Sequence, residues 1–210
     1  MRKKDIVKLV IAILIVIAII LVIGKITRSK NVNTRRLAQL YNELNTSQTY
    51  LFEMGKGADN KTIIAKKGDK TIIDQYSKDS HTTTIVKDNN TYLVLHDREE
   101  YYVYANNNVE QSILTDELKN IIDKEFTTGE EKVEGKKYSY EEYAGSTMFI
   151  EASSLDVNEE DIKTRFYFDN EDNLVYIRTI KGVNQELLKI NIQKEVDDSI
   201  FEIPSNYAEN

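Results

Sequence analysis

The chain of 210 residues has no cysteine and no tryptophan, and it has a single proline, Pro204. Without cysteine the protein forms no disulfide, has no thiolate for catalysis or zinc binding, and carries no lipid on a cysteine. No glycine-rich linker, repeat period or low-complexity block separates the chain into parts. About 180 residues remain after an unusual N-terminal segment, which is enough for one domain with a real core and short for two.

Positive charge is scarce outside the first 30 residues. These 30 residues hold seven of the 28 basic side chains and one of the 35 acidic ones. Residues 31–210 therefore hold 21 basic against 34 acidic side chains, a net charge of −13. A domain this acidic repels phosphate backbones, so the charge disfavours a nucleic-acid partner.

An uninterrupted apolar run, Leu9 to Gly24, marks the N-terminal segment. Snorkelling of Lys8 and Lys25 extends the run to a membrane-spanning helix over about 6–26. A cleaved signal peptide is the alternative, but no A-x-A-like cleavage site follows the run. We expect a short flank and a single-pass anchor over 1–30, and a domain over 31–210. Basic residues flank both ends, so charge does not fix orientation. The short N-terminal flank favours a plasma-membrane protein whose C-terminal domain is extracytoplasmic.

Apolar residues in the rest of the chain recur mainly with period two. Residues 186–195, "ELLKINIQKE", alternate most clearly, and "NEDN" at 170–173 joins two such segments as a hairpin. Two segments have helical spacing instead, one after residue 33 and one at 114–126, for which Thr115 is a suitable N-cap. We predict an α+β fold: a single curved antiparallel sheet (half-barrel) of about nine to eleven strands, covered by amphipathic helices.

Chemical motifs are scarce. The two histidines, His81 and His96, have no sequence spacing typical of metal ligands and are expected at strand ends. The stretch 169–173 has oxygen ligands but not the glycine of a calcium loop. Paired carboxylates are common in so acidic a chain and indicate solvated turns. A hydrolase with paired carboxylates is the weakest hypothesis; we expect no enzyme, no cofactor and no metal.

Tyrosine is abundant, with 13 residues, mostly on the expected strands. Strand propensity and cross-strand packing account for many of them. The alternative is an amphipathic surface for a protein contact, for which the candidates are Tyr101, Tyr102 and Tyr104.

Three phrases in the C-terminal half resemble the LolA/LppX-like family of lipoprotein-carrier and lipid-binding domains. They are "VEGKKY" at 133–138, "FDNEDNL" at 168–174 and "FEIPSNY" at 201–207. The resemblance covers about 34–207 and implies a half-barrel whose concave apolar face is plugged by helices and can hold acyl chains. It also implies that Phe201 and Ile203 end the last strand on the core side and that Pro204 stops it. The family has no catalytic residues.

The resemblance leaves two functions open. The first is a membrane-tethered domain that binds a lipid or other apolar ligand. Its groove candidates lie on both expected helices and on two expected strands: Leu37, Leu40, Tyr41, Leu44, Phe52, Leu118, Ile121, Ile122, Leu188, Ile190 and Ile192. The second is a tethered adaptor of the same fold that binds a cell-envelope protein, for example a cell-wall amidase. The Lys-, Asn- and Ile-rich composition suits a low-GC Gram-positive source.

The anchor leads to the first prediction. The full chain should stay in the membrane fraction after an alkaline carbonate wash, because about 20 apolar residues insert irreversibly where a peripheral protein is stripped. Recovery of a mature protein that begins near residues 25–30 would instead identify a cleaved signal peptide.

Overall fold

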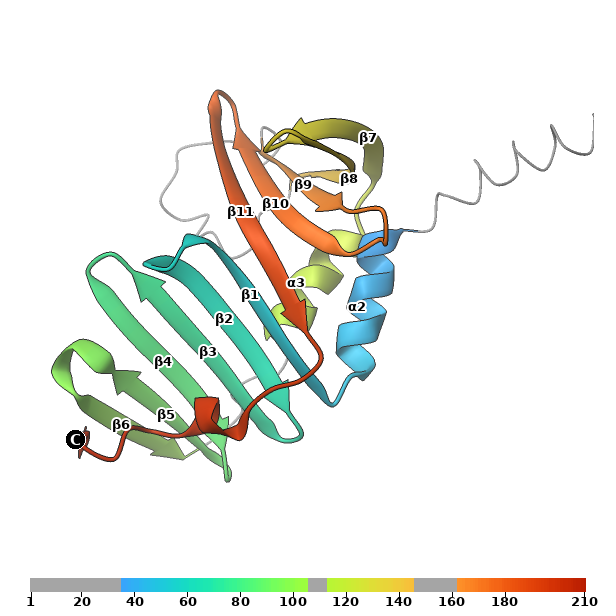
Figure 1. The fold of residues 1–210 in the computed structure, drawn as a ribbon. Helices are drawn as coiled ribbons and strands as arrows, with labels where there is room; N and C mark the ends of the chain where they lie inside the picture. The colour runs from blue at the N-terminus through green and yellow to red at the C-terminus, as the bar shows by residue number, and fades with distance from the viewer. Residues whose placement is uncertain (1–34, 106–112, 146–161) are drawn as a thin grey trace, which may run out of the picture. The chain divides into compact units, whose positions relative to one another are not determined.

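A computed structural model describes residues 35–105, 113–145 and 162–210 (Figure 1). The expected anchor at 1–30 lies outside these residues. Within the described ranges, no helix is both long and apolar enough to cross a membrane.

Twelve strands of the described residues form one sheet in the order β12-β6-β5-β4-β3-β2-β1-β11-β10-β9-β8-β7. Neighbouring strands are antiparallel, except that β12 pairs with β6 in parallel. The strands are β1 (Thr49–Gly57), β2 (Asn60–Lys67), β3 (Lys70–Ser77), β4 (Ser80–Lys87), β5 (Asn90–Leu95), β6 (Glu100–Ala105), β7 (Phe126–Val133), β8 (Lys136–Ala144), β9 (Ile162–Phe168), β10 (Leu174–Lys181), β11 (Asn184–Gln193) and β12 (Ala208–Glu209). The sheet is open and curved, which confirms the half-barrel architecture predicted from period-two patterning.

The described helices are α2 (Arg36–Thr46) and α3 (Ile113–Ile122), with 3₁₀ turns η2 (His96–Arg98) and η5 (Asp198–Phe201). Both α-helices pack on one face of the sheet, here called the helix face (Figure 1). Helix α3 begins two residues before Thr115, so Thr115 is a first-turn residue and the predicted cap is wrong. The fully buried Leu114 explains the earlier start, since its side chain belongs to the core.

Two-residue turns join the first five strands at a constant spacing. The turns lie at 58–59, 68–69, 78–79 and 88–89. Asp88 and Asn89 both have positive φ, 52° and 57°, as a type I′ turn requires. These tight turns fix the register of the β1–β5 meander, and they put odd and even residues of each strand on opposite faces.

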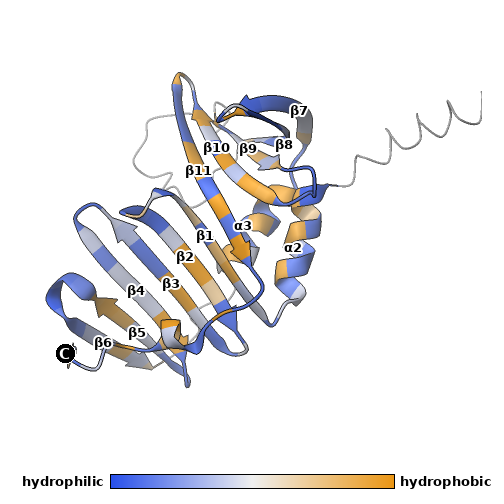
Figure 2. Cartoon of the chain, in the orientation of Figure 1, coloured by the Kyte–Doolittle hydropathy of each residue, from blue (hydrophilic) through white to orange (hydrophobic). Residues whose placement is uncertain are grey.

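The helix face carries the main core. It combines Leu37 and Leu44 of α2 with Leu118 of α3 and with Phe52 and Phe166 of the sheet. Apolar and polar bands alternate along β10 and β11 in Figure 2, as a sheet with one dry face requires. Burial of these side chains, at about 1.5–3 kcal/mol each, is the main source of the domain's stability.

The opposite face is covered in part by the C-terminal segment, residues 194–207. This segment crosses the meander after β11 (Figure 1), and its Phe201 is fully buried against Ile72, Ile85 and Val94. The expectation that Phe201 and Ile203 end the last strand is therefore wrong: β11 ends at Gln193, and Phe201 belongs to η5. The Phe201 ring therefore covers this face of the sheet from outside and is not part of a strand.

Pro204 lies in the turn that brings the chain to the sheet edge. The Tyr207 amide donates to the Pro204 carbonyl, and the Ala208 and Asn210 amides donate to the carbonyls of Glu99 and Tyr101. The single proline thus stands where no ladder donor is needed, between the covering segment and β12.

Glu141 of β8 fixes α2 on the sheet. Its carboxylate is almost fully buried and accepts hydrogen bonds from the Arg36 and Leu37 amides, at 2.6 and 3.2 Å, and from the Tyr143 hydroxyl at 2.9 Å. The Arg36 guanidinium lies 3.7 Å away. A sheet residue therefore satisfies the first amides of the helix, a role that a local N-cap side chain usually has.

Two predictions concern this architecture. Residues 31–210 produced alone should be soluble, β-rich by circular dichroism, and unfold in one cooperative transition, because one continuous sheet carries all of the described cores. Two separated transitions, or a mainly helical spectrum, would contradict the single-sheet domain.

Glu141→Ala should lower the free energy of unfolding by about 3–5 kcal/mol, because it removes the acceptor of two helix amides and the buried ion-pair partner of the Arg36 guanidinium. Glu141→Gln keeps an acceptor oxygen and should cost less. Glu130→Ala removes an exposed pair with Lys137 on the neighbouring strand and should cost less than about 1 kcal/mol. Denaturant titrations of the three variants measure the difference, and equal losses for Glu141→Ala and Glu130→Ala would refute the cap.

Candidate functional site

The largest of the described cavities lies between α2 and strands β10 and β11, with a volume of about 650 Å³. We call it the α2 groove. Its apolar lining comes from helix and sheet together: Leu40, Leu44, Tyr50, Leu174, Val175, Ile190 and Ile192. The volume falls in the range of about 300–1,000 Å³ that is typical of small-molecule sites.

Two ion pairs cross the rim of the α2 groove. Lys194, just after β11, lies 2.7 Å from Glu43 of α2, and Asp172, in the β9–β10 turn, lies 3.4 Å from Arg36 at the helix start. Both acids and Lys194 are more than half exposed. Water screens exposed pairs strongly, so these contacts close the groove with little energy.

The α2 groove combines these apolar side chains with five charged ones, Arg36, Glu43, Glu171, Asp172 and Lys194. Burial raises the pKa of Tyr50 to about 12, so its phenol stays protonated at physiological pH. The side chains of Leu40 and Ile192 are only half-buried and face the open space. An apolar lining under a charged rim suits a ligand with an apolar chain and a polar end.

The structure brings all eleven predicted groove residues into one hydrophobic cluster. Four of them line the α2 groove: Leu40, Leu44, Ile190 and Ile192. Five others are buried core residues outside its lining: Leu37, Phe52, Leu118, Ile121 and Ile122. Tyr41 and Leu188 are half-buried against the same cluster. That the set binds a ligand stays a prediction.

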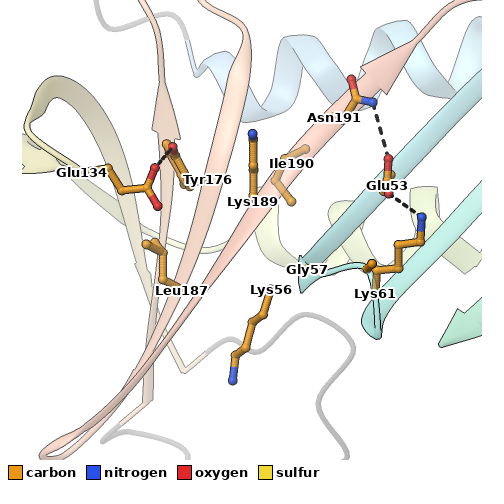
Figure 3. A pocket seen from close by; sticks show the side chains of 12 residues that line it. Glu53, Lys56, Gly57, Lys61, Glu134, Tyr176, Leu187, Lys189, Ile190 and Asn191 are labelled. Atoms are coloured by element: carbon orange, nitrogen blue, oxygen red, sulfur yellow. Dashed lines mark hydrogen bonds and ion pairs between the residues drawn. The ribbon is translucent and has the colours of Figure 1, made fainter. Parts of the chain in front are cut away.

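A second cavity, of about 530 Å³, lies on the opposite face over β1, β10 and β11 (Figure 3). Glu53 accepts from Lys61 at 3.0 Å, and Tyr176 donates to Glu134 at 2.7 Å. Gly55 borders this cavity at a β1–β2 irregularity, where an added Cβ would lie 2.5 Å from the Asn60 carbonyl oxygen. Lys56 and Lys189 add positive charge to the lining, which suits a polar or anionic group better than an acyl chain.

The three candidate partner tyrosines of β6 do not form one surface. Tyr101 packs against the C-terminal segment on the opposite face, where its hydroxyl donates to Glu209 at 3.1 Å. Tyr102 and Tyr104 point the other way, because neighbouring strand residues alternate between faces. Tyr104 is 52% exposed and is the more accessible of the pair.

The rings of His81 and His96 are in contact, although the two residues lie far apart in the sequence. The rings of His81 and His96 stack with centroids 3.7 Å apart and planes 7° apart, and Asp74 Oδ1 lies 2.8 Å from His81 Nε2. Burial lowers the pKa of His96, and the neighbouring His81 lowers it further. The β4–β5 pairing, in which Thr82 lies opposite Leu95, brings His81 and His96 together. Both histidines lie at strand ends as expected, but they form a cluster with Asp74 that their spacing in the sequence does not indicate.

Comparison with known proteins adds little to this geometry. No protein-family model matches the chain, and no curated protein matches it. Solved structures that resemble it include an uncharacterized conserved protein of Thermus thermophilus, at 8% identity and a TM-score of 0.44, and lipoprotein LppX of Mycobacterium tuberculosis, at 13% identity and a TM-score of 0.40. The first match covers 82% of this chain and 98% of that protein, and the second covers 79% and 98%.

Proposed function

We propose that this protein is a non-enzymatic binding domain for a lipid or other apolar ligand, held at the outer side of the plasma membrane by an N-terminal anchor. The α2 groove is the site, and its apolar lining beneath a charged rim is the observation that carries the proposal. The family resemblance of the C-terminal phrases supports the same ligand class.

Burial of an acyl chain supplies enough free energy for this function. Each methylene removed from water contributes about 0.8 kcal/mol, so a chain of about 16 carbons offers about 13 kcal/mol. A micromolar dissociation constant corresponds to about 8 kcal/mol, which leaves about 5 kcal/mol for ordering the ligand and opening the rim. The charged rim then contacts a polar headgroup without desolvation of the ion pairs.

The tether follows from the apolar run at 6–26 and supports the choice of ligand. A domain attached beside a bilayer meets lipids at high local concentration, so even modest affinity gives occupancy. The anchor precedes α2 in the chain, and α2 forms one wall of the groove.

One observation favours the adaptor as a second candidate function. Tyr104 exposes half of its surface on β6, and β12 pairs only with Glu100 and Tyr101 of that strand. Among the described residues the rest of this side of β6 has no strand partner, and an exposed tyrosine there suits a protein partner of the cell envelope.

The ligand prediction uses residues 31–210 purified without detergent. Native mass spectrometry should detect bound lipid, and organic extraction should release it. Leu40→Gln places an amide in the groove and should weaken binding about tenfold or more, because it removes apolar contact worth about 1.5 kcal/mol.

The matched control is Leu93→Gln, at a half-buried leucine of β5 that does not line the groove. It should leave lipid binding unchanged. An apo mass for the wild type, with no thermal shift on addition of fatty acids or phospholipids, would reject the lipid proposal. If Tyr104→Ala then also weakened cross-linking to an envelope protein without unfolding the domain, the adaptor would replace it.

A further inference from the structure

Asp74 and the two histidines lie close together on the opposite face of the sheet, away from the α2 groove. Asp74 lies on β3, His81 on β4 and His96 directly after β5. Asp74 Oδ1 and one ring nitrogen from each histidine all lie within 4.8 Å of one another. Each side chain is half-buried, so the cluster is held in place yet accessible to an ion from solvent.

We propose that Asp74, His81 and His96 bind a divalent transition-metal ion, of which Zn²⁺ fits best. Two imidazole nitrogens and one carboxylate oxygen are ligands that Zn²⁺ accepts at about 2.0–2.2 Å, with a further position left for water. Hard ions such as Mg²⁺ and Ca²⁺ prefer sets made of oxygens alone, so the two nitrogens select against them.

Neighbouring groups already orient the ligands. The Thr83 side chain is buried beside the cluster, and its hydroxyl lies 2.6 Å from Asp74 Oδ1 and 2.7 Å from His96 Nε2. The Tyr207 hydroxyl lies 3.0 Å from His96 Nδ1. When Nε2 of His96 binds the metal, its Nδ1–H donates to Tyr207, and such outer partners fix the tautomer of a metal-bound histidine.

Binding requires a small rearrangement of the rings. A metal lies in the plane of each imidazole it binds, whereas the two rings are now nearly parallel. They have to tilt about their last side-chain torsion, which has a broad energy minimum in histidine. Tyr76, stacked on His81 at 4.0 Å, limits this motion from one side.

A cavity of about 280 Å³ adjoins the cluster. Its other walls are mainly apolar side chains of the sheet and of the C-terminal segment, among them Ile72, Ile200 and Pro204, with Glu202 beside them. The ion therefore lies at the polar end of a pocket between sheet and C-terminal segment, and through Tyr207 it ties that segment to the sheet.

The test uses the full chain without a histidine tag, stripped with a chelator and desalted. Calorimetric titration with ZnCl₂ should show one site per chain. His81→Phe and His96→Phe keep an aromatic ring in the stack but remove the ligand, and each should weaken Zn²⁺ binding by more than about 100-fold. Tyr207→Phe should weaken it by about 10-fold, and Asp79→Asn, an exposed acid at the tip of the β3–β4 hairpin, should change nothing.

Nuclear magnetic resonance of the wild type gives an answer that does not depend on any variant folding. The chain has two histidines, so its spectrum contains two sets of imidazole signals. Both sets should shift in proportion to added Zn²⁺ up to one equivalent, and MgCl₂ should shift neither. Unshifted imidazole signals, or equal Zn²⁺ affinity in the double variant His81→Phe/His96→Phe, would overturn the proposal.

Discussion

The buried carboxylate of Glu141 is the contact on which the helix face depends. It joins the first two helical amides of α2 to the middle of β8, a strand more than 100 residues later in the chain. The positive end of the helix dipole and the Arg36 guanidinium, 3.7 Å away, both attract this carboxylate. Because the N-terminal end of α2 is fixed in this way, Leu37 fills the core and Leu40 is left over the groove.

Fixing one end of α2 also determines how the α2 groove can open. The buried cap holds the start of the helix, while exposed ion pairs and half-buried side chains hold the wall that faces β11. Local opening is cheapest where few buried apolar contacts are lost. Under the proposed function, the wall near Leu40 and Glu43 is therefore the part expected to open for a ligand, while the core around Leu37 and Leu118 stays packed.

Much of the fold could be predicted from the sequence because its information is local. The alternation in "ELLKINIQKE" predicts β11, and "NEDN" predicts the β9–β10 turn. A further local signal is a turn residue that recurs every ten positions, at Asp59, Asp69, Asp79 and Asn89. These residues lie in the hairpin turns of the β1–β5 meander. The prediction for the C-terminal segment is wrong because Phe201 fits an alternating pattern equally well as a strand residue or as a plug.

Long-range contacts could not be read from the sequence. Nothing near Glu141 distinguishes it from the exposed Glu130, because its role depends on a helix 105 residues away. The histidines are fifteen residues apart, and only the register of β4 and β5 shows that they meet. The groove could not be predicted for the same reason. Spacing in the sequence identifies apolar side chains on one face, but only the structure shows which of them fill the core and which line a cavity. Leu40 and Ile192 are half-buried at the groove, so under the proposed function we expect substitutions there to affect ligand binding more than stability.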